Sequence, residues 1–364
     1  MSSALLLNDS PEHAGVGRYA YSLWRAMKQI KAPVDMAVFN YGTPTRSLYG
    51  ERIIQAPLRF PILNRTLNWF YGLPRAVPTG YGLYHGTNQH MAKALLATKG
   101  LRVLTMHDVI AMDPGEGHPA VRFFERDALR KLRDIDRIIT ISHHSKKEIN
   151  RVLHVPIDKI DVTWLGVDNA AFKPGPKTVS RKALLLPQEK KIVLHIGGDE
   201  PRKNLYGALN AFALLKDRNS LFIHVGHAST QTRMIAQKLG IEKRVYFIER
   251  APQEKLVHYY RAANVFLFPS LHEGFGLPVA EAMACATPVV TSNNTALGEI
   301  AGRSALTVNP HDFREIARAL EASLYDEKIS WRLSQAGLKR SAMFSWTECA
   351  KRTLDSYKKA GWQP

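Results

Sequence analysis

The sequence contains little cysteine and no long hydrophobic run. Its 364 residues include two cysteines, Cys285 and Cys349, and no CxxC pair or Cys/His cluster, so neither a disulfide framework nor a structural zinc site is expected. The apolar stretch near the amino terminus is interrupted by Asn8 and Asp9, too early for a secretory signal peptide. No stretch reaches the about 18 apolar residues of a membrane span. We therefore expect a protein of a reducing compartment, the cytoplasm.

Acidic residues are scarce relative to basic ones. The chain has 50 Lys and Arg against 32 Asp and Glu, a formal net charge of +18. Such a surface attracts anionic partners: nucleic acid, phosphorylated metabolites or acidic lipids. The excess is spread along the chain, with 22 basic and 15 acidic residues in 1–170 and 28 and 17 in 171–364. Because proteins that bind nucleic acid concentrate cations on one surface, no nucleic-acid partner is expected.

Short β-rich segments alternate with amphipathic helical segments, the pattern of parallel sheets covered by helices. In the second half the pattern predicts strands over 191–198, 221–227, 245–250, 265–270, 288–293 and 305–310. It predicts helices over 204–216, 230–239, 252–263, 278–286, 312–325 and 345–360. The first half is less regular, with strands expected over 4–8, 34–40, 83–87, 102–108 and 137–142. The fold class is therefore α/β, with two doubly wound, Rossmann-like domains.

The domain boundary is expected where periodicity is lost and Gly and Pro gather, in residues 166–178. We predict a first domain of residues 1–170 and a second of 171–344. Residues 42–80, with five prolines and several aromatic residues, fit neither pattern and are interpreted as an insertion in the first domain.

Ligands of doubly wound folds bind beyond the carboxyl ends of the strands, and the loop at 272–284 is rich in suitable residues. Gly274 and Gly276 allow close approach of the backbone to a ligand, and free N–H groups at the following helix would attract an anion. Glu273 and Glu281 are carboxylates that can accept hydrogen bonds from sugar hydroxyls. The alternative is an ordinary turn in which Glu281 is a solvated helix residue.

A second loop, GGDEPRKN (197–204), places Arg202 and Lys203 near the start of a helix. Two fixed cations beside backbone donors suit a diphosphate; the alternative is a solvated charged turn. The loop is neither a GxGxxG fingerprint nor a Walker A motif, which disfavours hydride transfer and P-loop hydrolysis. No DxD-like pair follows a strand, so no metal cofactor is expected.

Two loops of the first half complete the candidate site. His107, with Asp108 beside it, lies at the end of a predicted strand, where an imidazole can orient a substrate hydroxyl; the alternative is a structural histidine. Gly15 and Gly17 lie in a turn that enters a helix after the first strand. They permit close approach of a phosphate or sugar, with a tight structural turn as the alternative.

Together these loops resemble the retaining glycosyltransferases of family four, which have the two-domain GT-B fold. The resemblance is carried, in order, by GVGRYAYSL (15–23), HGTN (85–88), HD (107–108), ISHHSKKEI (141–149), LGVD (165–168), PRKN (201–204), EGFGLPVAEAMA (273–284) and VNPHD (308–312). It implies a nucleotide diphosphate sugar held by the second domain and an acceptor that enters from the first.

The resemblance also implies residue roles. Arg202 and Lys203 would hold the diphosphate, and Glu281 the ribose. Glu273 would hold the transferred sugar together with the backbone amides near Phe275, Gly276 and Leu277, and His107 would face that sugar. The final residues, 345–364, would pack back on the first domain.

Three positions depart from the family pattern. Ala286 stands where Gly is frequent, and Gly298 where Pro is common. The segment 197–199 lacks the Arg that some members carry there, so the diphosphate would depend more on Arg202.

The predicted reaction is transfer of a hexose from a nucleotide diphosphate sugar, with retention of anomeric configuration and without a metal. GDP-mannose is the favoured donor, because the HGTN and EPRKN segments are similar to those of mannosyltransferases; a UDP-hexose stays open. The alternatives are a nucleotide-sugar epimerase, a glycan phosphorylase, a basic nucleic-acid-binding protein and an inactive sugar-binding relic.

The acceptor is expected to be a glycan or a lipid-linked molecule in polysaccharide biosynthesis. The predicted helix at 118–137 carries a basic stripe of Arg122, Arg126, Arg130 and Arg133 beside an apolar one of Phe124, Ala128, Leu132 and Ile135. The insertion adds Arg59, Arg65 and Arg75 among aromatic residues. Such surfaces suit a peripheral contact with the anionic inner face of the cell membrane; the alternative is a half-buried helix and a structured loop.

Overall fold

The computed structural model describes residues 3–12, 14–41, 47, 49–57, 67–110, 129 and 131–364. Several residues predicted to contact a membrane lie outside these ranges: Arg59, Arg65, Arg122, Phe124, Arg126, Ala128 and Arg130. The chain forms two compact units. The first unit comprises residues Met1–Gly166 and Trp346–Pro364, and the second comprises Val167–Ser345.

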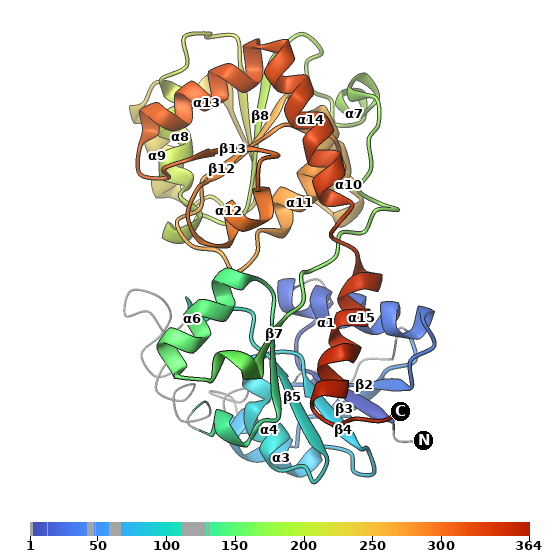
Figure 1. The fold of residues 1–364 in the computed structure, drawn as a ribbon. Helices are drawn as coiled ribbons and strands as arrows, with labels where there is room; N and C mark the ends of the chain where they lie inside the picture. The colour runs from blue at the N-terminus through green and yellow to red at the C-terminus, as the bar shows by residue number, and fades with distance from the viewer. Residues whose placement is uncertain are drawn as a thin grey trace. The chain divides into compact units, whose positions relative to one another are not determined.

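The first unit is built on a seven-stranded parallel sheet of order β3-β2-β1-β4-β5-β6-β7 (Figure 1). Its strands are β1 (Ala4–Asn8), β2 (Val34–Asn40), β3 (Arg52–Gln55), β4 (Leu83–Gly86), β5 (Leu101–Thr105), β6 (Arg137–Thr140) and β7 (Ile160–Val162). The longer helices are α1 (Gly15–Gln29), α6 (His143–Leu153) and α15 (Trp346–Lys359), with the shorter η1 (Asn68–Gly72), α3 (Leu73–Ala76) and α4 (Ala92–Leu96). Buried Leu5, Leu104 and Ile138 belong to its core.

Three sequence predictions for this unit were wrong in detail. Residues 42–80 are not wholly an insertion, because β3 lies within them as an edge strand of the sheet. The predicted strand 102–108 ends at Thr105, so His107 follows the strand. The predicted helix at 118–137 does not extend to its end, because Leu132–Asp134 form a 3-10 turn and β6 begins at Arg137.

The second unit has a six-stranded parallel sheet of order β10-β9-β8-β11-β12-β13. The strands are β8 (Ile192–Ile196), β9 (Leu221–Val225), β10 (Val245–Ile248), β11 (Val265–Phe268), β12 (Val289–Ser292) and β13 (Leu306–Val308). The helices are α7 (Lys177–Ala183), α8 (Leu205–Ala213), α9 (Thr230–Lys238), α10 (Gln253–Ala262), α11 (Leu277–Ala284), α12 (Thr295–Ala301), α13 (Phe313–Tyr325) and α14 (Glu327–Ser341). Buried Val193, Phe222 and Leu267 belong to its core.

Each sheet contains one point where the strand order reverses. In the first unit the chain moves from β1 to β2 in one direction and from β4 to β5 in the other. The second unit repeats this reversal between β8 and β11. Because parallel crossovers are right-handed, the reversal sends helices to opposite faces of the sheet and opens a crevice at the carboxyl ends of the two strands.

Helix α15 belongs to the first unit although the second unit precedes it in the chain. It lies along α1 (Figure 1), and the rings of Tyr19 and Trp346 are 6.3 Å apart. Its Ser356 hydroxyl and Lys359 ammonium donate to the two oxygens of Asp161 on β7, at 2.8 and 2.7 Å. The helix is thus bound to the sheet by packing and by charge.

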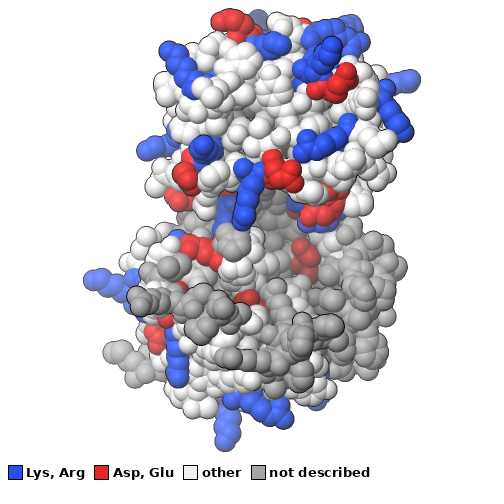
Figure 2. Space-filling view, turned by 180° about the vertical axis from the view of Figure 1, so that it is seen from behind, with Lys and Arg blue, Asp and Glu red and all other residues white. Residues whose placement is uncertain are grey.

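Basic and acidic side chains are mixed on the face of the second unit that Figure 2 shows. Figure 2 shows Lys and Arg interspersed with acidic and uncharged residues on the visible face of the second unit. None of the helices in the described part of the chain combines the length and apolar composition needed to cross a bilayer.

Candidate donor and acceptor sites

The two loops predicted to bind the donor meet at the reversal point of the second sheet. One follows β8 and leads through a 3-10 turn (η6, Pro201–Lys203) into α8. The other runs from the end of β11 to α11. Leu271 N–H donates to the carbonyl of Arg202 at 2.7 Å, and the Asn204 amide donates to the carbonyl of Pro269 at 3.0 Å. The loops are therefore fastened to each other directly.

Arg202, Lys203 and Glu273 form one charge cluster on these loops. Lys203 Nζ lies 2.6 Å from Glu273 Oε1 and Arg202 Nη1 lies 3.4 Å from the same oxygen. The Lys203 ammonium also lies 5.2 Å from the centre of the Phe268 ring, close enough for a cation–π contact. The cluster has two cations for one carboxylate, so it retains the net positive charge that a diphosphate requires.

The glycine loop before α11 presents its backbone rather than its side chains. Gly276 has a φ of +94°, and a Cβ there would lie 2.4 Å from Leu297 Cδ2, so the turn requires glycine. Phe275 is buried and packs edge-on against Phe344 at 5.5 Å. Gly274 is buried in the same loop, and Leu277 is the first residue of α11. Contacts with a ligand would therefore come from backbone amides here.

Glu281 is buried on α11, with 2% of its surface exposed. Its Oε2 accepts a hydrogen bond of 2.9 Å from the hydroxyl of Tyr260 on α10. The alternative of a solvated helix residue was therefore wrong. A hydrogen bond from Tyr260 fixes the orientation of the carboxylate, which suits binding of a sugar diol.

Two histidines beneath the donor loops were not singled out from the sequence. His195 on β8 and His224 on β9 are fully buried, and their Nδ1 atoms are 3.0 Å apart. His224 Nε2 lies 3.1 Å from the carbonyl of His227, so this nitrogen donates and its Nδ1 accepts from His195. Burial lowers the pKa of both rings, which keeps them neutral near pH 7. The sequence signal that could have identified this pair is that each histidine is the next-to-last residue of its strand, in two successive strands.

His107 lies just beyond β5 in the first unit. Its Nε2 donates to the carbonyl of Thr87 at 3.0 Å, and its ring stands edge-on to Tyr19 at 4.9 Å. Burial lowers its pKa to about 4, so the imidazole is neutral near pH 7 with Nδ1 as the acceptor. The predicted role of His107 involves the other unit and stays a prediction. Asp108 caps the next turn by accepting from Ile110 N–H at 3.1 Å.

Gly15 and Gly17 lie in the first turn of α1, not in a loop before it. A Cβ on Gly17 would lie 1.8 Å from the carbonyl oxygen of Pro11. Glycine is therefore needed here because the helix packs closely against the preceding loop. A Cβ on Gly15 would meet nothing within 4 Å. Of the two, Gly15 is the one with room for a ligand.

A buried hydrogen-bond network holds the sheet of the first unit to α1 and α15. His85 Nδ1 lies 2.7 Å from the Tyr357 hydroxyl, and His85 Nε2 lies 2.7 Å from the Thr105 hydroxyl. Thr105 in turn lies 2.8 Å from the hydroxyl of Tyr19. Burial lowers the pKa of His85 to about 3. His85, the histidine of the HGTN segment, thus links β5 to α15 inside the first unit.

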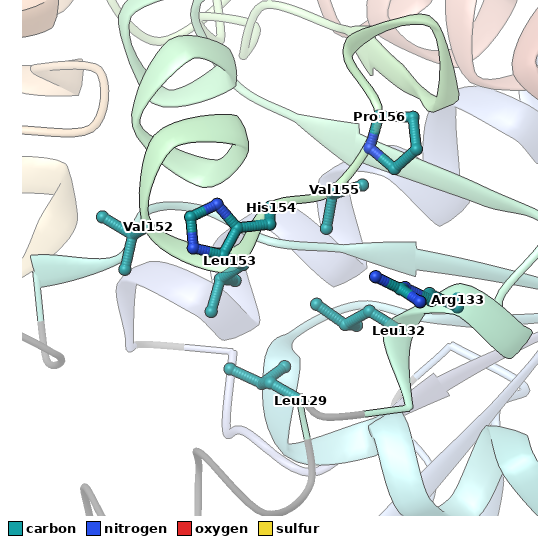
Figure 3. Close-up of a pocket in the computed structure, with 8 residues that line it drawn as sticks. All are labelled: Leu129, Leu132, Arg133, Val152, Leu153, His154, Val155 and Pro156. Carbon is teal, nitrogen blue, oxygen red and sulfur yellow. The ribbon is translucent and has the colours of Figure 1, made fainter.

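A cavity of about 490 Å³ lies at the end of α6 (Figure 3). Its walls are mainly apolar, with Arg133 and His154 as the polar members. None of the predicted site residues lines it, so it is separate from the candidate donor site. In the described ranges no group of three or more His, Cys, Asp or Glu side chains is arranged to hold a metal ion.

Comparisons with known proteins cover both units. Residues 13–171 match the model "Glycosyltransferase Family 4", and residues 176–340 match "Glycosyl transferases group 1". The chain is 33% identical over 293 residues to the O-antigen chain mannosyltransferase B of Escherichia coli, covering 76% of this chain and 74% of that protein. It is 32% identical over 234 residues to the D-inositol 3-phosphate glycosyltransferase of Mycolicibacterium smegmatis, covering 62% and 54%.

A solved structure gives the same fold. The sucrose-phosphate synthase of Thermosynechococcus elongatus superposes with a TM-score of 0.83 over 98% of each chain, at 22% sequence identity.

Proposed function

Because this chain belongs to the family-four glycosyltransferases, with their GT-B fold, we propose that it is a hexosyltransferase that moves mannose from GDP-mannose to a glycan or lipid-linked acceptor. The observation that carries the choice of mannose is the 33% identity to a mannosyltransferase over three quarters of both proteins. The name of that relative also supports a place in polysaccharide biosynthesis.

The proposed step breaks the bond between the sugar C1 and the diphosphate oxygen and forms a bond from C1 to the acceptor oxygen on the same face. The acceptor proton passes to the departing phosphate, and GDP leaves. Negative charge grows on the diphosphate as the bond breaks. Arg202 and Lys203, fixed beside the start of α8, would stabilise that charge.

Ligand contacts follow from the same loops. We assign the ribose to Glu281, whose carboxylate is oriented by Tyr260. The hexose is assigned to Glu273 and to the backbone amides of Phe275, Gly276 and Leu277, where the turn at Gly276 opens α11.

No metal is required in this proposal. The pair of cations supplies the positive charge that a divalent ion supplies in other transferases. Turnover should therefore persist in excess EDTA. Loss of turnover with EDTA and its return with added Mg²⁺ or Mn²⁺ would contradict metal independence.

Thermal denaturation with GDP-mannose, GDP-glucose, UDP-glucose and UDP-galactose tests the donor. A ligand that binds the folded state raises the melting temperature in proportion to the logarithm of its concentration, and GDP-mannose should give the largest rise. Transfer from the stabilising donor to a mannose-terminated acceptor should then give an α-linked product. The one-bond C1–H1 coupling constant in the NMR spectrum of the product identifies the anomer. A β-linked product would refute retention.

A UDP-hexose donor is the second candidate. A relative of 32% identity is named for D-inositol 3-phosphate and not for mannose, so membership of the family does not by itself fix the donor sugar. Stabilisation by the UDP sugars alone would replace GDP-mannose with this candidate.

A further inference from the structure

The cations proposed to bind the diphosphate are already occupied by the carboxylate proposed to bind the sugar. Glu273 Oε1 lies 2.6 Å from Lys203 Nζ and 3.4 Å from Arg202 Nη1. The side chains of Glu273, Lys203 and Arg202 are 11%, 14% and 25% exposed. At such exposure solvent screens the charges only in part. The Glu273 carboxylate thus occupies the position beside Lys203 and Arg202 that an anionic ligand would take.

A diphosphate must therefore compete with Glu273 for Lys203 and Arg202. The neighbouring carboxylate Asp199 is committed elsewhere, because its Oδ2 accepts from Ser229 N–H at 2.7 Å and from the Thr232 hydroxyl at 3.1 Å. Glu273 is the carboxylate that the structure pairs with both Lys203 and Arg202, so the diphosphate competes with Glu273. Once displaced, its carboxylate would lie next to the bound diphosphate, and two anions at short range repel each other.

We propose that Glu273 discriminates between the intact nucleotide sugar and the spent nucleoside diphosphate. This inference rests on the proposed function. The hexose hydroxyls of an intact donor can donate hydrogen bonds to the displaced carboxylate, which compensates for its lost ion pairs. A nucleoside diphosphate offers no such donors and carries more negative charge. Glu273 therefore opposes its binding and regains Lys203 and Arg202 when the product leaves.

The surrounding structure limits this exchange to side chains. Leu271 N–H holds the Arg202 carbonyl at 2.7 Å, which fixes the backbones of the two loops against each other. A Cβ built on Gly197 would lie within 4 Å of both the Lys203 stem and His195, so the stem runs close to the strand end. Phe268 lies under its ammonium. The backbone at Arg202 and the stem of Lys203 are thus held in place, and in this inference Glu273 is the member of the cluster whose partners change with the ligand.

Titration calorimetry without acceptor tests the inference on Glu273→Gln, which removes the charge and keeps the shape. The probes are GDP, GDP-mannose, UDP and UDP-glucose. In this variant the affinity for the free diphosphate should rise by roughly 10-fold, as expected for removing one nearby charge at intermediate dielectric. The affinity for the matching nucleotide sugar should stay level or fall. The gain for the diphosphate should shrink between 50 and 300 mM NaCl.

Glu281→Gln is the matched control. Its carboxylate contacts Tyr260 and is assigned to the ribose, which both ligands contain, so their affinities should fall together. Glu273→Ala, checked for folding by circular dichroism, should repeat the gain for the diphosphate. If the affinities for the free diphosphate and for the nucleotide sugar change equally in both Glu273 variants, the inference is overturned and the proposed function is not. If the wild-type protein binds none of the four probes, the proposed function fails and the inference fails with it.

Discussion

Two glutamates of one motif have different partners in the structure. Glu273 is paired with Lys203 and Arg202, whereas Glu281 is oriented by the neutral hydroxyl of Tyr260. The spacing of eight residues places one before the glycine turn and the other one helical turn beyond it. Glu273 therefore lies beside the cations proposed to bind the diphosphate, whereas Glu281 lies in a neutral environment away from them.

Removal of either cation should impair transfer. Arg202→Ala or Lys203→Ala should lower kcat/KM by roughly 10²–10³-fold, because each variant loses a preorganised charge at the departing diphosphate. Steady-state kinetics with the identified donor would measure the loss. Lys216→Ala, at an exposed lysine of the same unit, should keep wild-type kinetics. Near-normal turnover in both cation variants would contradict the assignment.

His85 should make the first unit sensitive to acid. Its pKa is lowered to about 3 by burial, so the unfolded chain takes up a proton first as the pH falls below about 6.5. Stability is then lost with falling pH by about 1.4 kcal/mol per unit for this group. His85→Gln should reduce that slope in urea unfolding between pH 5 and 7.

His227→Gln is the control for the pH slope. This exposed histidine has a raised pKa through its hydrogen bond to Glu249, so its contribution has the opposite sign and its removal should not reduce the loss in acid. An unchanged slope in His85→Gln would show that the buried imidazole does not titrate in this range.

Sequence reasoning brought the site residues together but did not give their contacts. Arg202 and Glu273 follow strands that are neighbours at the reversal point, so their proximity was predictable from order alone. The pairing of Glu281 with Tyr260 joins two helices, and the pairing of His195 with His224 depends on strand register. Such contacts depend on packing details that residue spacing does not encode.

At the scale of elements, the two glycines at the start of α1 have different surroundings: Gly17 is tightly packed, and Gly15 has free space around it. Gly17→Ala should destabilise the first unit by roughly 3 kcal/mol, because its Cβ would overlap the Pro11 carbonyl. Gly15→Ala meets no neighbour and should leave stability unchanged. Urea unfolding would compare them. Equal destabilisation would contradict this difference, and a loss of turnover in Gly15→Ala alone would indicate a ligand at that helix end.

Two strands that the sequence analysis missed share a physical cause. β3 and β7 have four and three residues, too few to show alternation, and both are edge strands. Longer strands rich in apolar residues, such as β1 and β2, were predicted with their observed bounds. Helices α7, α12 and α14 were also not predicted; α12 begins at Thr295, a residue with positive φ.

At the scale of the molecule, the charge excess leads to the prediction of membrane contact. Arg75 and Tyr71 are exposed, but Trp69 is not available to a bilayer: it stacks on His90 at 3.8 Å and donates to Asp9 at 2.7 Å. We expect flotation with vesicles that contain acidic lipid at low salt and not with neutral vesicles. Arg75→Glu should weaken binding several-fold, whereas Lys216→Glu in the other unit should weaken it less. No binding to acidic vesicles would refute the proposal.

Helix α15 has a consequence for the order of events at the ribosome. The first unit lacks this helix until residues 346–359 have been made, whereas the second unit is complete at Ser345. Domains usually fold during synthesis in the order in which they emerge. Here the buried His85 of the first sheet can form its hydrogen bond to the Tyr357 hydroxyl only after residues 167–345 have been synthesised. The six strands of the second sheet, which end at Val308, can therefore pair while the amino-terminal sheet still lacks the helix that packs on it.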